Sequence, residues 1–138
     1  MINAAFEHVA LNVPDRDAFV RWYVDNVGLQ VVRDIPGKMA FLADSQGVVM
    51  LEVYSNSNAQ QLEFAATDPL AVHVAFEVDD PAAAAETLVA AGASIHDPFK
   101  TAGDDTMVML RDPFGIGLQL IRRGSPMRGA MVAGGADH

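Results

Sequence analysis

The sequence has no cysteine, few basic residues and no long apolar run. Without cysteine it can form neither a disulfide framework nor a thiolate metal site. Its 9 Lys and Arg residues are outnumbered by 18 Asp and Glu residues, and the net charge of −9 opposes nonspecific binding to nucleic acid or anionic membranes. No apolar run approaches the roughly 20 residues of a membrane span, and the start Met-Ile-Asn-Ala lacks the basic residues of a signal peptide. We therefore expect a cytoplasmic protein that binds neither nucleic acid nor membrane.

The composition is that of a folded protein, because 51% of the 138 residues are hydrophobic. A chain of this length is large enough to bury a sizeable core without disulfides. We expect a single domain over residues 1–123. The remaining residues, 124–138, are expected to form a tail, because their composition is typical of a disordered segment.

Two similar predicted strands organise the chain. The first, FEHVALNV, covers residues 6–13, and the second, AVHVAFEV, covers residues 71–78. Side chains alternate between the two faces of a strand, so His8 and His73 each lie opposite the larger apolar residues of their strand. Each strand leads into a helix start that contains Asp and Pro, PDRDAF or DDPAAA. This repetition indicates an internal duplication.

The first half continues with a helix predicted over about residues 15–26. Asp15 suits its N-cap and Gly28 the left-handed position after its end. Aromatic residues recur at helical spacing, which favours packing of this helix on a sheet. Three strands are then predicted at residues 29–34, 39–43 and 48–54.

The second half repeats this order after a linker over residues 56–68. Its helix is predicted over about residues 81–91, with Asp79 or Asp80 as the cap and Gly92 closing it. A short strand at residues 93–96, a flexible loop KTAGDD, a strand at 107–110, a DPFG turn and a strand at 117–121 follow. The sequence therefore predicts an α+β fold with two βαβββ repeats, at about residues 5–55 and 70–122.

Polar residues also recur on the last predicted strand of each half. Glu52 follows His8 at nearly the spacing at which Gln119 follows His73. A carboxylate buried on an apolar strand is costly unless it is paired or coordinates a metal. Two imidazoles, one carboxylate and one amide oxygen suit a divalent ion with coordination positions left open. These four residues are therefore the predicted metal ligands, although each residue alone also fits a surface or core role.

The chain resembles the vicinal oxygen chelate superfamily, which includes glyoxalase I, bleomycin-resistance proteins and extradiol dioxygenases. The resemblance covers about residues 5–122 and rests on FEHVALNV, RWYVDNVGLQVV, VMLEVYSN, AVHVAFEV and LRDPFGIGLQLI. It implies a glyoxalase-like fold, in which two βαβββ modules form a cup-shaped mixed sheet, and a homodimer. It also implies that the first and last strands of each module supply the metal ligands, here His8, Glu52, His73 and Gln119.

Within this superfamily the order His, Glu, His of the first three ligands resembles glyoxalase I. Asn56 also matches an asparagine that such enzymes use for glutathione. Gln119 departs from the pattern, because glyoxalase I has a glutamate there, and so does Asn12, which stands where glyoxalase I has an arginine. Gln119 argues against an extradiol dioxygenase, which takes its carboxylate from the final strand.

The resemblance implies a metal-dependent lyase or isomerase. One divalent ion, of nickel, zinc, manganese, cobalt or iron, would chelate a small α-oxo or hydroxy substrate and stabilise an enediolate during proton transfer. Glu52 is expected to be the catalytic base, because it is the carboxylate among the four ligands. Two alternatives stay open, a noncatalytic small-molecule binding protein of the antibiotic-binding type and an extradiol-type dioxygenase.

Further residues are expected to contact the substrate or to remain on the surface. The expected substrate contacts are Asn12, Met50, Tyr54, Asn56, Met107 and Met109. Arg33, Arg111 and Arg122 are expected to be solvated surface charges that an anionic group of the substrate could reach.

Overall fold

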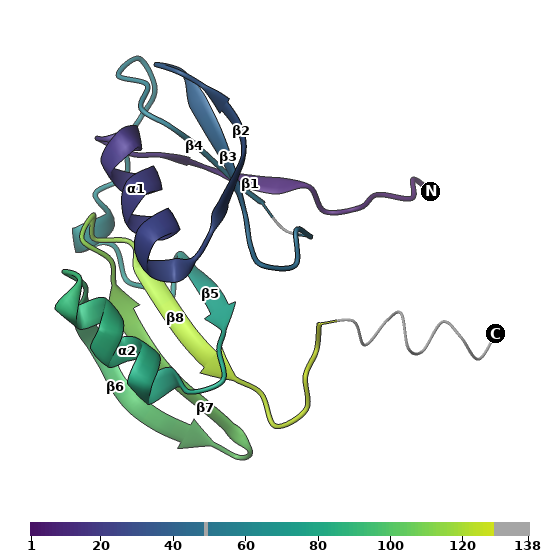
Figure 1. Ribbon diagram of the computed structural model, residues 1–138, viewed down its shortest axis with the longest axis vertical. Helices are drawn as coiled ribbons and strands as arrows, with labels where there is room; N and C mark the ends of the chain where they lie inside the picture. The colour runs from purple at the N-terminus through teal and green to yellow at the C-terminus, as the bar shows by residue number, and fades with distance from the viewer. Residues whose placement is uncertain (49, 129–138) are drawn as a thin grey trace. The chain divides into compact units, whose positions relative to one another are not determined.

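The computed structural model describes residues 1–48 and 50–128, which divide into two units between Glu63 and Phe64. In each unit a strand, an α-helix and three further strands follow one another along the chain (Figure 1). The predicted α+β class and the two βαβββ repeats are therefore confirmed. Most of the predicted tail lies outside the described residues. Neither described α-helix is both long and apolar enough to cross a membrane.

The first unit is a four-stranded mixed sheet with one helix. Its strands are ordered β1-β4-β3-β2, with β1 parallel to β4 and the other neighbours antiparallel. The parallel pair requires a crossover, which passes through the helix and the hairpin. The elements of this unit are β1 (His8–Asn12), α1 (Arg16–Val27), β2 (Gln30–Ile35), β3 (Met39–Ala43) and β4 (Met50–Tyr54).

Helix α1 begins and ends where the sequence predicts. The Asp15 side chain accepts a hydrogen bond from the Ala18 backbone N–H at 3.0 Å, and Gly28 closes the helix with a φ of 83°. The rings of Phe19 and Tyr23 are fully buried and stack at 4.4 Å between centroids. The helix contacts β3 and β4, so the aromatic residues form the core of this unit.

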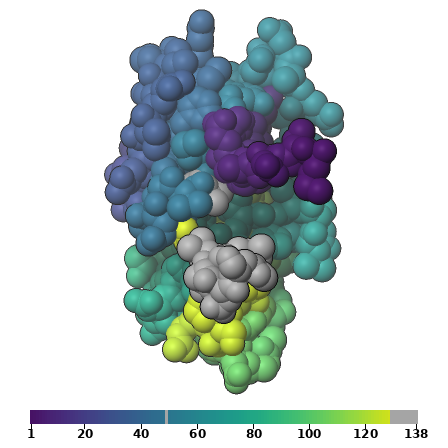
Figure 2. Space-filling view, turned by 90° about the vertical axis from the view of Figure 1, so that its right-hand side faces the viewer, coloured from purple at the N-terminus to yellow at the C-terminus, as the bar shows by residue number. Residues whose placement is uncertain are grey.

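The segment before β1 is exposed along its whole length. Residues 1–7 are all exposed, and the purple atoms of the N-terminal segment stand at the surface in the space-filling view (Figure 2). Strand β1 begins at His8, two residues later than predicted. The N-terminal segment therefore adds no buried residue to the core.

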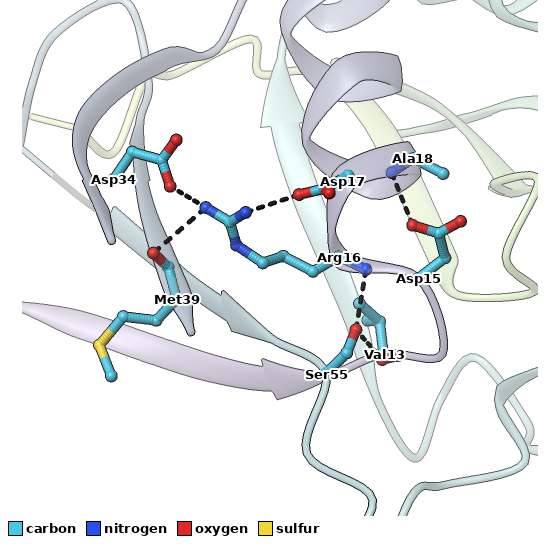
Figure 3. A network of polar contacts seen from close by, with 8 residues as sticks. All are labelled: Val13, Asp15, Arg16, Asp17, Ala18, Asp34, Met39 and Ser55. Carbon is cyan, nitrogen blue, oxygen red and sulfur yellow. Dashed lines mark hydrogen bonds and ion pairs between the residues drawn. The ribbon is translucent and has the colours of Figure 1, made fainter. Parts of the chain in front are cut away.

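Arg16 ties the start of α1 to the β2–β3 hairpin (Figure 3). A cation in the first turn of a helix opposes the helix dipole, so this residue needs anionic partners. Its guanidinium pairs with Asp17 at 2.6 Å and with Asp34 on β2, and it donates to the Met39 carbonyl at 3.3 Å. The Arg16 side chain is only 10% exposed. The network therefore holds the helix end against the hairpin.

We expect Arg16→Met to lower the free energy of unfolding by about 1 to 3 kcal/mol, because it removes hydrogen bonds to charged groups from a nearly buried position. Chemical denaturation followed by circular dichroism measures this loss. Arg21→Met is the control, since Arg21 is exposed on the same helix and should change stability by less than about 0.5 kcal/mol. Equal losses in the two variants would show that the network adds no stability.

The second unit repeats the architecture. Its strands are ordered β5-β8-β7-β6, with β5 parallel to β8. Helix α2 begins at the Asp80 cap and buries Ala85 and Leu88 on the side facing the sheet. The elements are the short 3₁₀ helix η1 (Phe64–Ala66), β5 (His73–Glu77), α2 (Pro81–Ala90), β6 (Ser94–Ala102), β7 (Asp105–Arg111) and β8 (Gly117–Arg122).

The predictions of a short strand at residues 93–96 and of a flexible loop at KTAGDD are wrong. Strand β6 runs through to Ala102, and β7 begins at Asp105, so the predicted loop is a tight hairpin. Two register shifts in β6 interrupt the alternation of side chains that would have identified a long strand. Pro98 is tolerated because β6 is an edge strand, where a missing N–H costs no ladder hydrogen bond.

Asp105 anchors the chain that leaves β8. Its carboxylate accepts hydrogen bonds from Arg123 at 2.7 Å and from the Gly124 backbone N–H at 3.0 Å. The Arg123 hydrogen bond, followed by that of Gly124, lowers the pKa of Asp105 below its ordinary value of 3.8. Because the folded pKa is the lower one, the stabilisation is complete above pH 3.8 and is lost as the pH falls through the folded pKa.

We therefore expect Asp105→Asn to be less stable than the wild type at neutral pH and to approach it as the solution is acidified below pH 3.8. Urea denaturation over a series of pH values measures the difference. Asp104→Asn, a change in the adjoining turn residue, should show no such dependence. A deficit of Asp105→Asn that stayed constant with pH would contradict the assigned ion pair.

Candidate functional site

The predicted ligands occupy equivalent positions in the two sheets. In the first unit His8 pairs with Met50, two residues before Glu52 on β4. In the second unit His73 pairs with Gly117, two residues before Gln119 on β8. An offset of two residues keeps both side chains on the same face of a sheet. Each sheet therefore carries one histidine and one predicted oxygen ligand at the same relative register.

This shared face lies opposite the helix in each unit. On β4 the residues that alternate with Glu52, Leu51 and Val53, are buried in the helix-covered core. On β8 the residues that alternate with Gln119, Leu118 and Leu120, are almost completely buried on the α2 side. The predicted ligands thus lie on the faces that the helices leave open.

His8 and Glu52 form a direct contact. His8 Nε2 lies 2.8 Å from Glu52 Oε2, and His8 Nδ1 lies 3.1 Å from Glu7 Oε1. The Phe41 ring packs edge-on against the imidazole, at 5.6 Å between centroids. Neighbouring ligands of an octahedral ion with bonds of about 2.0–2.1 Å lie about 2.9 Å apart. The separation of these two side chains therefore fits two adjacent ligands of one divalent ion.

His73 is oriented by a backbone carbonyl. Its Nδ1 lies 2.7 Å from the Pro69 carbonyl oxygen. A carbonyl can only accept, so Nδ1 carries the hydrogen and Nε2 keeps its lone pair in the neutral ring. Metal-binding histidines are commonly held in this way by a partner on the second ring nitrogen. His73 thus has the orientation and the free nitrogen that a metal ligand needs.

Gln119 lies beside the second histidine strand. Its amide nitrogen contacts Met107 Sδ at 3.8 Å, and no described residue donates a hydrogen bond to its amide oxygen. That oxygen is a neutral ligand atom that suits a hard divalent ion. Among the described residues, no three His, Cys, Asp or Glu side chains gather in a metal-binding group. Each unit supplies two of the four predicted ligands, and the complete set stays a prediction.

The open face of the second sheet contains a pocket of about 370 Å³. This volume is within the range of about 300–1,000 Å³ typical of small-molecule sites. Met107, Met109 and Gln119, all predicted site residues, line it together with Asp97 and Lys100 from β6. The β6 residues were missed because the sequence suggested a strand end and a loop there. Lys100 and Asp97 form an ion pair of 2.6 Å in this pocket.

The predicted substrate contacts of the first unit fall into two groups. Met50 and Tyr54 alternate with Leu51 and Val53, so they share the open face with Glu52. The Asn12 amide is engaged by the loop after β4. It donates to the carbonyls of residues 56, 59 and 60 at 3.0, 3.4 and 3.1 Å and accepts from the Asn56 N–H at 2.8 Å. Contact of these four residues, Asn12, Met50, Tyr54 and Asn56, with a substrate stays a prediction.

Arg111 is not the solvated surface charge that the sequence suggested. Its guanidinium donates to the carbonyls of Phe64 at 2.8 Å, Thr67 at 3.0 Å and Gly115 at 3.0 Å. A side chain that uses its donors on three carbonyls is held in place by the fold. No local sequence signal identifies this role, because two of the three partners lie more than forty residues away along the chain.

Comparison with known proteins identifies the family. Residues 5–120 match the model of the Glyoxalase/Bleomycin resistance protein/Dioxygenase superfamily. The chain belongs to this superfamily, as its resemblance to the vicinal oxygen chelate proteins indicated. Among curated proteins no relative matches the sequence.

Solved structures share the fold at low sequence identity. UcmS2 is 19% identical with a TM-score of 0.72, covering 88% of this chain and 100% of its own. TnmS3, an antibiotic binding protein from Streptomyces sp. CB03234, is 19% identical with a TM-score of 0.70, covering 90% of this chain and 99% of its own. Lactoylglutathione lyase from Agrobacterium tumefaciens is 24% identical with a TM-score of 0.64, covering 87% of this chain and 94% of its own.

Proposed function

We propose that this chain is a metal-dependent lyase or isomerase, similar to glyoxalase I, whose ion is held by His8, Glu52, His73 and Gln119. The observation that carries the proposal is the equal register of the two ligand pairs on the open faces of the two sheets. The 2.8 Å contact between His8 and Glu52 and the orientation of His73 support it. Membership of the superfamily makes a divalent ion the expected cofactor.

When bound, the ion supplies Lewis-acid polarisation of adjacent oxygen atoms of the substrate. Glu52 is the proposed base that removes a proton from the neighbouring carbon, because it is the carboxylate among the four residues. His8 Nε2, which would bind the ion through its lone pair, lies 2.8 Å from Glu52 Oε2. Gln119 cannot take this role, since an amide has no useful basicity. The second unit therefore contributes neutral ligands, and the first contributes the proton acceptor.

We propose that the pocket in the second unit binds part of the substrate. Its walls include Leu70, Met107 and Met109, which suit an apolar group, and Gln119, one of the four proposed ligands, lines the same pocket. Methionine side chains adapt to ligands of different shape. We propose a small, partly apolar α-oxo or hydroxy compound as the substrate. The proposed contacts of the first unit are Asn12, Met50, Tyr54 and Asn56.

Glu52→Gln should abolish proton transfer, with a loss of about 10²- to 10⁴-fold, because the amide cannot accept the proton. Deuterium exchange at the carbon beside the carbonyl, followed by NMR over a panel of small α-oxo and α-hydroxy compounds, measures this step. Metal content should be retained in part, since the amide oxygen can still bind an ion. Glu86→Gln, an exposed change on α2, should leave exchange unaltered. Exchange that survives in Glu52→Gln would rule out this residue as the base.

Elemental analysis of protein purified without added metal should find close to one divalent ion per chain. The double variant His8→Ala, His73→Ala should lose that ion, because it removes a ligand from each unit. Stoichiometric metal in the wild type, together with its loss from the double variant, would support the ligand set, and the analysis would identify the element. A wild type that carries no ion and takes up none on reconstitution would contradict the enzyme proposal.

The second candidate function is noncatalytic binding of a small molecule. The pocket favours it, because all of its lining residues belong to the second unit and its volume is typical of a small-molecule site. Binding that persists after chelation, without turnover, would distinguish this function from the enzyme. An extradiol-type dioxygenase is a weaker candidate, since Gln119 provides no carboxylate, and oxygen uptake would reveal it. The resemblance also implies a homodimer, which light scattering measures.

A further inference from the structure

Three residues of the second sheet form one row across neighbouring strands. Arg111 on β7 pairs with Gly117 on β8, and Gly117 pairs with His73 on β5. Residues paired in this way extend from the same face, which here is the open face that carries Gln119. The arginine and the histidine are therefore separated by a residue without a side chain.

The segment that precedes β5 lies over this gap. A Cβ atom at Gly117 would lie 3.0 Å from the Cβ atoms of both Pro69 and His73. A Cβ atom at Gly115 would lie 2.7 Å from the Ala65 backbone nitrogen. Both contacts are closer than ordinary van der Waals packing, so the two glycines make room for residues 64–69 against the start of β8.

Arg111 also contacts residues 64–69, through hydrogen bonds to their backbone. Its guanidinium donates to the Phe64 and Thr67 carbonyls within the segment and to the Gly115 carbonyl in the turn before β8. Pro69 follows Thr67 by two residues, and its carbonyl accepts the hydrogen bond from His73 Nδ1. A chain of contacts therefore runs from Arg111 through the backbone segment to the imidazole.

The first unit lacks this arrangement at the equivalent row. There His8 pairs with Met50, which pairs with Ala43, so neither a glycine gap nor an arginine is present. His8 Nδ1 instead lies beside Glu7, which is 66% exposed. The two histidines are thus held by different means, His8 by an exposed carboxylate and His73 by a clamped backbone carbonyl.

We propose that Arg111 is a positioning residue for His73, which it keeps protonated on Nδ1 with Nε2 free. The further statement that His73 Nε2 binds the ion rests on the proposed function. The hydrogen bonds of Arg111 go to backbone carbonyls and not to a predicted ligand, so it would act on the imidazole through residues 64–69 and the turn before β8. Lysine should not replace it, because a single ammonium group lacks the planar set of donors that reaches several carbonyls together.

Nitrogen NMR of the His73 ring, at a pH where imidazoles are neutral, tests the proposal in Arg111→Met. The wild type should show a single tautomer with the proton on Nδ1, and the variant should show a mixture. Arg21→Met, an exposed arginine of α1, is the control and should match the wild type. The affinity for the ion found in the wild type should fall about 10- to 100-fold in Arg111→Met, the usual cost of losing such support.

Gly117→Ala provides a second perturbation of the same contact, because its Cβ atom displaces Pro69 or His73. It should shift the tautomer in the same direction, and it decides the matter if Arg111→Met does not fold. A folded variant that keeps the Nδ1 proton fully in place would overturn the proposal. A tautomer shift in a protein that binds no divalent ion would support the role of Arg111 and refute the proposed metal function.

Discussion

The pairing register between the first and last strands of each repeat is the constraint on which the candidate site depends. Each sheet has one face covered by a helix, so every second residue of β4 and β8 is an apolar core residue. The intervening positions are then free to carry polar groups without disturbing the core. Because β1 pairs with β4 and β5 with β8 at the same offset, each open face carries a histidine and, two positions along on the neighbouring strand, a candidate oxygen ligand.

The sequence reveals features that depend on neighbouring residues and misses those that depend on distant ones. The Asp15 cap and Gly28 identify α1, and the period-2 pattern identifies β3 within its observed bounds. The length of β6 could not be predicted, because its bulges break that period. The role of Arg111 could not be predicted from the sequence either, since its partners are backbone carbonyls, which every residue possesses. Only the fold selects which carbonyls an arginine reaches.

The candidate ligands could be proposed from the sequence because the duplication repeats the same weak pattern in both halves. A histidine on a strand is uninformative by itself, but His8 and His73 precede Glu52 and Gln119 in matching contexts. The structure adds what repetition could not show, namely the 2.8 Å contact of one pair and the carbonyl that orients the other. The pocket beside Gln119 could be predicted only in part, because three of its lining residues, His96, Asp97 and Lys100, come from β6, whose length the sequence does not reveal.

The repeats have kept their topology while their open faces have diverged. The first carries a carboxylate, Glu52, in contact with its histidine, whereas the second carries the neutral Gln119 beside a pocket. A carboxylate can accept a proton and an amide cannot, so the proton transfer that we propose would take place at the first repeat. The second repeat instead has Gly117, whose missing side chain lets a backbone segment orient His73. Under the proposed function, the first repeat would supply the proton acceptor and the second would supply two neutral ligands, and these few differences leave the βαβββ framework unchanged.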